Sequence, residues 1–240
     1  MSGHLNPGGQ RFRRDRGGAE PRVAAALAAY QAGRGSEQAV LAALATARLL
    51  VPVVAVLADG TAAKGDKDSE MVLPTLIGRD GRPAVLAFTS LDALARWRPN
   101  ARPVPAEADR VWRGAVAEGC AVVIDVAGPV PLAVEGARLA ALAAGQPVPP
   151  PHEDPDVRAE VQAAIAAEPA IAGFTLAPGC QAGREAGREA GREDGPDLAI
   201  TLRLSETTRE TGPAVNRAAA GIAARLATRL RRGIEVIIAG

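Results

Sequence analysis

Residues 71–99 constrain the fold most, because they join two apolar strands through a tight turn and lead directly into a short helix. Asp80 and Gly81 separate the apolar runs 71–77 and 84–88, and an Asp-Gly pair between apolar runs is the strongest short-range signal of a β-hairpin. A hairpin that leads into a helix predicts one sheet with a helix attached. The segment holds no nucleophile, metal cluster or phosphate loop, so it indicates a fold and no chemistry.

The sequence around this hairpin alternates between helical and strand patterns. Val23, Leu27 and Tyr30 recur at helical spacing, whereas residues 51–58 form a β-branched apolar run that is typical of a buried strand. These patterns predict helices near residues 21–32, 36–44, 90–98, 106–119 and 135–144, and further strands at 51–58, 120–126 and 132–134.

A proline-rich stretch separates this first part of the chain from a second. Residues 146–155 read QPVPPPHEDP and show no apolar periodicity, which is typical of a semi-rigid linker. Beyond it the alternation begins again. Helices are predicted to start at Pro155 and Pro213, and strands are predicted at 170–176, 198–204 and 234–238. The arginines at 229, 231 and 232 are expected at the C-terminal end of the second of these helices, where positive charge complements the helix dipole.

The predicted fold class is α+β, with two small domains that each pack a sheet against helices and are joined by a Pro-rich linker. We expect a disordered tail at 1–20, a first domain at 21–145, the linker at 146–154 and a second domain at 155–240 with an insertion at 179–196. This insertion holds tandem copies of Ala-Gly-Arg-Glu. Because Gly at every fourth position opposes helix and strand alike, we expect a disordered loop, with partner binding by the repeat as the alternative.

The charge balance and the cysteine content limit which partners and which cellular compartment are expected. With 28 basic and 27 acidic residues the net charge is +1, whereas nucleic-acid binders carry a strong positive excess, so nucleic acid is not an expected partner. Two cysteines are too few for a disulfide framework, which favours a reducing cytoplasm. Charged residues and glycines follow the Arg13-Arg14 pair where an export signal would need an apolar core, and no apolar run reaches membrane-spanning length. We therefore expect a soluble cytoplasmic protein with no membrane partner.

The residues that commonly carry covalent chemistry are few and scattered. Cys120 begins an apolar strand and Cys180 lies in a Pro-Gly loop, while His4 and His152 lie in the tail and the linker. A nucleophilic cysteine needs a base beside it, so buried inert thiols are expected instead. Two separated histidines also provide no spacing for a metal site. Residues 60–65 superficially match a phosphate loop, but they lack its Ser/Thr ending and are followed by acidic residues, which favours a solvated loop.

The candidate binding surface consists of Phe88, Thr89, Ser90 and Trp97. A large amphipathic ring such as that of Trp97 is favoured at binding hot spots. In a chain with 2% aromatic residues, the same ring is the expected filler of the core between helix and sheet. Thr89 and Ser90 are also candidate caps of the helix that follows them.

Residues 73–105 (LPTLIGRDGRPAVLAFTSLDALARWRPNARPVP) resemble the core of the SseB N-terminal domain, the enhanced serine sensitivity protein family, in its actinobacterial form. The shared features are the Asp-Gly turn, the Ala-Phe-Thr-Ser run at 87–90, and Trp97 followed by Arg-Pro-Val at 102–104. The resemblance covers residues 23–144, and residues 154–240 are similar in plan to the C-terminal domain often attached to this module. It implies a bacterial, cytoplasmic α+β domain with no catalytic residues to carry over.

Together, the residues and the resemblance predict a non-enzymatic accessory or interaction protein whose partner is a protein, with a family name that links it to serine sensitivity. We expect no catalytic residue, no cofactor and no metal, and the patterns do not determine the oligomeric state. The alternative is a small-molecule-binding or weakly catalytic protein that uses the face near residues 88–97. A polar cavity near Thr89 would favour the ligand, and a flat apolar patch would favour the protein partner.

Overall fold

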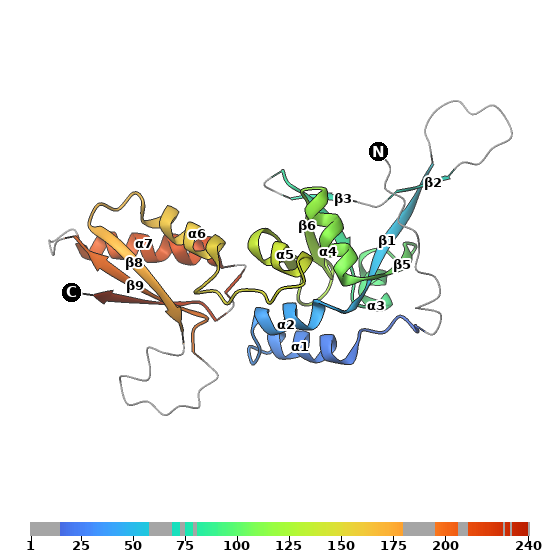
Figure 1. Cartoon of the computed structure of the whole chain (residues 1–240), viewed down its shortest axis with the longest axis horizontal. Helices are drawn as coiled ribbons and strands as arrows, with labels where there is room; N and C mark the ends of the chain where they lie inside the picture. Colours follow the sequence, from blue (N-terminus) through green and yellow to red (C-terminus); the bar gives the residue numbers. More distant parts are fainter. Residues whose placement is uncertain are drawn as a thin grey trace. The chain divides into compact units, whose positions relative to one another are not determined.

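The computed structural model describes residues 15–57, 69–72, 75–78, 81–179, 195–205, 211–227, 229–230 and 232–239. The chain divides into two compact units (Figure 1). The first combines the chain up to Ala28 with Leu41–Pro147, and the second combines Ala29–Val40 with Val148–Gly240. Helices and sheets occur in both parts, which confirms the α+β prediction. The domain limits at 145 and 155 stay a prediction.

Two small sheets form the framework of the first unit. In one, a central strand pairs antiparallel with both neighbours, in the order β2-β1-β5; in the other the order is β3-β4-β6-β7. The strands are β1 (Arg48–Leu57), β2 (Ser69–Val72), β3 (Thr75–Ile77), β4 (Pro83–Ala87), β5 (Arg102–Glu107), β6 (Ala121–Ile124) and β7 (Leu132–Val134). Leu50 and Phe88 join the sheets through two backbone hydrogen bonds of 2.8 Å.

The predicted hairpin is present as the antiparallel pair β3 and β4. Gly78 N donates to Arg82 O at 2.8 Å, and Gly81 has a φ of +79°, in the left-handed region that glycine adopts without strain. The predicted strand at 71–77 is wrong in one respect, because its two halves lie in different sheets as β2 and β3. Pro74 within the run is the sequence signal for this division, since proline has no amide hydrogen to donate to a sheet.

The prediction of a helix over residues 106–119 is wrong at its start, because residues 106 and 107 belong to strand β5. Residues 102–107 pair with β1 at the edge of the sheet, and helix α4 (Ala108–Ala117) begins only after them. The sequence Arg-Pro-Val-Pro-Ala-Glu carries two prolines, which argue against an interior strand but are tolerated on an edge. The pairing partner β1 lies far away in the sequence, so the local pattern did not show this strand.

Apart from the later start of α4, the helices of the first part of the chain lie close to their predicted positions. They are α1 (Pro21–Gln31), α2 (Glu37–Leu44), α3 (Leu91–Trp97), α4, and α5 (Gly136–Ala143). A core cluster around the sheet junction contains Phe88 and Leu86 from the strands and Leu94 from α3. The side chain of Trp112 on α4 is fully buried. None of the helices in the described ranges is long and apolar enough to cross a membrane.

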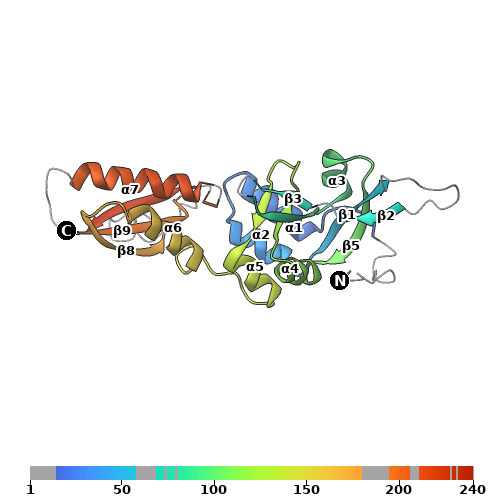
Figure 2. The ribbon, with the colours of Figure 1, turned by 90° about the horizontal axis from the view of Figure 1, so that it is seen from above.

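The second unit packs helices against one three-stranded sheet. Its elements are α6 (Pro155–Ile165), β8 (Ile171–Pro178), β9 (Leu198–Leu204), α7 (Thr211–Leu226) and β10 (Ile234–Ala239). Strand β9 is central, antiparallel to β8 and parallel to β10, and α7 makes the crossover that a parallel pair needs (Figure 2). Val157, Ile200 and Ile222 represent the buried core between α6, the sheet and α7.

Helix α7 ends at Leu226, so the arginines predicted for its last turn lie beyond it. Arg229 instead forms an ion pair with the buried Asp154, and Arg232 pairs with Asp197 at 2.8 Å. Specific carboxylates therefore bind these two arginines. The repeat in the 179–196 insertion and the loop at 60–65 lie outside the described residues.

Candidate functional site

A buried polar pair lies where strands β4 and β6 end. These strands are parallel, so their carboxyl ends meet at the same edge of the sheet, and Thr89 after β4 contacts Asp125 after β6. Thr89 donates its backbone N–H to Asp125 Oδ1 at 2.8 Å and its hydroxyl to Oδ2 at 2.6 Å. Both residues are buried. Each oxygen of the carboxyl group thus accepts a hydrogen bond from the same residue.

The surroundings of Asp125 disfavour its charged form. Burial raises the pKa of the Asp125 carboxyl above its ordinary value, while the hydrogen bonds from Thr89 and the positive charge of Arg96 act in the opposite direction. Asp125 also has a φ of 49°, a left-handed conformation that aspartate tolerates, and its carbonyl accepts from Gly128 N at 2.7 Å. With both oxygens bound to Thr89, this carboxyl ties two strand ends together.

The guanidinium of Arg48 extends the pair into a network. Arg48 is buried on β1, and its Nη1 donates to the carbonyl oxygen of Thr89 at 3.1 Å. Its Nε lies 2.6 Å from Asp15 Oδ2, and its Nη2 donates to Gly18 O. A buried charge is costly unless it is paired and hydrogen-bonded, and Arg48 meets both conditions.

Residues 15–20, which the sequence predicts to belong to a disordered tail, lie against the start of α3, and residues 1–14 lie outside the described residues. Gly17 O accepts from Leu91 N at 2.7 Å, and Glu20 Oε1 accepts from Arg48 N at 2.7 Å. Gly17 is buried with a φ of +77°, and a Cβ placed there would lie 2.2 Å from Leu91 Cδ1. This position therefore requires glycine.

The four candidate surface residues lie together, but they differ in accessibility. Phe88 and Thr89 are buried and are inaccessible to a partner, whereas Ser90 and Trp97 are half-buried. Ser90 Oγ accepts from Ala93 N at 3.1 Å, which confirms its capping role. Thr89 does not cap the helix, because its hydroxyl is bound to Asp125.

The Trp97 ring lies between the two alternatives considered from the sequence, because it is partly buried and partly exposed. It packs against the buried cluster, with 5.5 Å between its centroid and that of Phe88. It also retains exposed surface, and the Arg98 guanidinium carbon lies 5.5 Å from its centroid. The tryptophan that is fully buried is Trp112, whose Nε1 has no hydrogen-bond partner among the described residues.

The remaining candidates show no assembled chemistry in the described part of the chain. Cys120 is a free thiol and is half-buried, not buried as predicted, with its Sγ 3.5 Å from Glu118 O. His152 Nε2 lies 3.5 Å from Glu153 Oε1. Within the described ranges, no group of three or more His, Cys, Asp and Glu side chains could hold a metal ion. Cys180 and His4 lie outside these ranges.

Sequence reasoning missed Asp125, Arg48 and Asp15. Asp125 carries one local signal, since it follows a β-branched strand and precedes a glycine by three residues, a pattern typical of a turn. Arg48 stands at the start of an apolar strand, where a charged residue needs a buried partner. Its partner Asp15 lies in a Gly- and Arg-rich segment whose composition indicated a disordered tail.

The first unit is thus a small α+β domain in which a buried polar network fastens the strand ends and the segment before α1. Residues 23–141 match the family model described as SseB protein N-terminal domain. The chain belongs to the SseB family through this domain. No curated protein and no solved structure matches the chain.

Proposed function

We propose that this SseB-family chain is a non-enzymatic cytoplasmic accessory protein that binds another protein through the surface around Trp97. The observation that carries the proposal is the half-buried Trp97 ring, which packs on the buried Phe88 and keeps part of its surface exposed. An aromatic ring held by the core loses little conformational freedom on binding, and tryptophan is enriched among binding hot spots. The position of Trp97 therefore favours a contact with a macromolecule.

The polar groups near Trp97 support protein binding over the small-molecule alternative. A ligand site at residues 88–97 would need accessible donors and acceptors at Thr89. Thr89 N–H and hydroxyl both donate to Asp125, and its carbonyl accepts from Arg48. A general acid or base at Asp125 would likewise need an accessible carboxyl oxygen, and the buried oxygens each accept from Thr89.

The test is affinity capture from the native lysate with the intact protein and two variants. Trp97→Ala is expected to lose the captured partner while it remains folded, with a loss of about 2 kcal/mol in stability because the ring is only half-buried. Val116→Ala is the matched control, since Val116 is an exposed apolar residue on α4. It is expected to retain the partner.

Purified partner and protein are then titrated by calorimetry, with folding of each variant checked by circular dichroism. Equal affinity of wild type and Trp97→Ala would place the partner elsewhere. A metabolite that raises the melting temperature of wild type but not of Thr89→Val, in the absence of any captured protein, would support the alternative function.

A further inference from the structure

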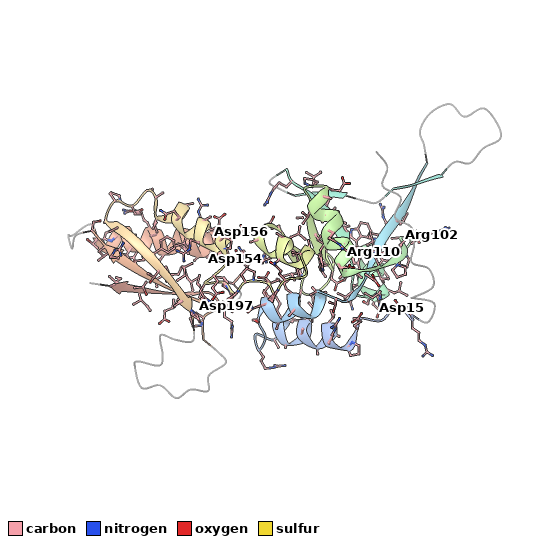
Figure 3. All side chains as sticks on the ribbon, in the orientation of Figure 1. Asp15, Arg102, Arg110, Asp154, Asp156 and Asp197 are labelled. Carbon is pink, nitrogen blue, oxygen red and sulfur yellow. The ribbon has the colours of Figure 1, made fainter. Side chains whose placement is uncertain are left out.

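Three arginines lie close to Trp97 in the sequence, and one of them, Arg98, places its guanidinium over the Trp97 ring. We call Arg96, Trp97, Arg98 and Arg102 together the tryptophan-arginine surface. Arg96 and Trp97 end α3, Arg98 is its C-cap, and a hydrogen bond of 3.1 Å from Ala101 N to Arg98 O closes the turn that leads to β5. All three arginines are exposed. Arg102, labelled in Figure 3, lies at the start of β5.

No ion pair within the described residues joins the arginines of this surface to a carboxylate, and the charge of Arg96 acts over a longer range on the buried Asp125. By contrast, Arg82, Arg110 and Arg113 each pair with a carboxylate. Asp15, the acid in the segment before α1, is bound to Arg48. On α3 itself, Asp92 is the one acidic residue. The tryptophan-arginine surface therefore carries a local positive excess on a chain whose net charge is only +1.

We propose that the tryptophan-arginine surface binds an acidic peptide segment of the partner protein, an inference that rests on the proposed function. Guanidinium groups bind carboxylates through paired, charge-assisted hydrogen bonds. The exposed part of the Trp97 ring beside them provides contact area for an apolar side chain next to the acidic residues. Arginine and tryptophan are both among the side chains that are enriched at binding hot spots.

An acidic peptide fits this surface better than a nucleic acid does. Single-stranded nucleic acids stack their bases on free aromatic faces, and the Trp97 ring already contacts Phe88 and the Arg98 guanidinium. Nucleic-acid binders also carry an extended basic stripe, whereas the other arginines on α4, Arg110 and Arg113, are paired with acids. From α3 to α4, the unpaired positive charge is thus restricted to the short segment 96–102, which matches a short acidic peptide.

The test uses the full chain and three fluorescein-labelled probes, with binding followed by anisotropy at low and at physiological salt. The probes are a peptide of Glu-Glu-Leu repeats, a matched Gln-Gln-Leu peptide and an oligo-dT strand. The test variant changes Arg96, Arg98 and Arg102 to Gln. The control variant changes the ion-paired Arg82, Arg110 and Arg113 to Gln, so that both variants lose the same charge.

We expect the wild type to bind the acidic peptide above the Gln peptide and oligo-dT, more weakly at higher salt because the charges are exposed. The test variant should bind about tenfold more weakly and the control within about twofold of wild type. Equal losses in the two variants, no binding to the acidic peptide, or tighter binding to oligo-dT would overturn the inference.

Failure of this inference is distinguishable from failure of the proposed function. If the arginine test variant still captures the same protein partner as wild type, and Trp97→Ala does not, the protein-binding function stands and the acidic chemistry is wrong. If neither variant changes capture, the tryptophan-arginine surface is not the site.

Discussion

At the residue scale, the pair of Asp125 and Thr89 shows how a buried carboxyl is held without a direct ion pair. Two hydrogen bonds from Thr89 compensate part of the desolvation cost, and the remaining cost raises the pKa of Asp125. Both carboxyl oxygens accept a hydrogen bond from Thr89 when Asp125 is ionised. When the carboxyl is protonated, only the oxygen without the proton is a free acceptor. The stability of the first unit should therefore respond to pH at this residue.

Asp125→Asn is expected to remove that response. Because the folded pKa of Asp125 lies above the unfolded value near 3.8, the folded state binds more protons between the two values. The contribution of Asp125 to the free energy of unfolding is therefore most favourable below that interval and falls as pH rises through it. The asparagine can accept from Thr89 N and donate to its hydroxyl, so at neutral pH we expect stability within about 1 kcal/mol of wild type.

The measurement is urea unfolding of both proteins across the acidic range. The free energy of wild type minus that of Asp125→Asn should decline as pH rises and then level off. Thr89→Val should enlarge the decline, because it removes a hydrogen bond that lowers the pKa. A difference that is independent of pH would show that the carboxyl titrates alike in the folded and unfolded states.

At the element scale, the segment at residues 15–20 behaves as part of the domain because Arg48 holds it. Asp15, Gly18 and Glu20 all contact Arg48, and Gly17 bonds to the first residue of α3. These contacts join the start of β1, the start of α3 and the chain before α1. One ion pair and several hydrogen bonds therefore position this segment.

Asp15→Ala is expected to destabilise the protein by about 2 kcal/mol, less than for a fully buried pair because Asp15 is partly exposed. It should also speed trypsin cleavage after the exposed Arg16, since the segment is then held by fewer bonds. Cleavage rates are compared by mass spectrometry. Glu118→Ala, an exposed acid beyond α4, is the control and should leave cleavage at Arg16 unchanged. Unaltered cleavage in Asp15→Ala would contradict the role given to Arg48.

At the scale of the whole molecule, each unit contains its own buried cluster. The first unit has the Phe88 cluster at the junction of its sheets, and the second has an apolar core drawn from α6, α7, β8 and β9. Ala29–Val40 groups with the second unit, where Gln38 Nε2 donates to Val148 O at 3.0 Å. Separate cores favour separate folding.

Fragments of residues 15–147 and 148–240 are each expected to melt cooperatively. The second fragment lacks Ala29–Val40 of its unit, and loss of the Gln38 hydrogen bond alone should cost about 1 kcal/mol. A first fragment that begins at residue 21 should be less stable than one that begins at residue 15, because Arg48 then lacks its ion-pair partner Asp15. Calorimetry of the fragments is the measurement, and an unfolded second fragment would show that its core depends on the first unit.

The sequence by itself determined the features that depend on neighbours in the chain. The hairpin of β3 and β4, the Ser90 cap, the proline start of α6 and the SseB resemblance all rest on residues a few positions apart. Turn geometry, capping and apolar periodicity are local effects, so a local pattern predicts them.

Only the tertiary structure decided β5, the depth at which each tryptophan is buried, and the polar network. Strand β5 forms because β1 offers an edge, and the pair Thr89 and Asp125 forms because β4 and β6 run parallel. Asp125 lies 36 positions from Thr89, and Arg48 lies 41 positions from it. Contacts over such separations depend on strand order and register, and these arise from the packing of the whole core and leave no signal in a short stretch of sequence.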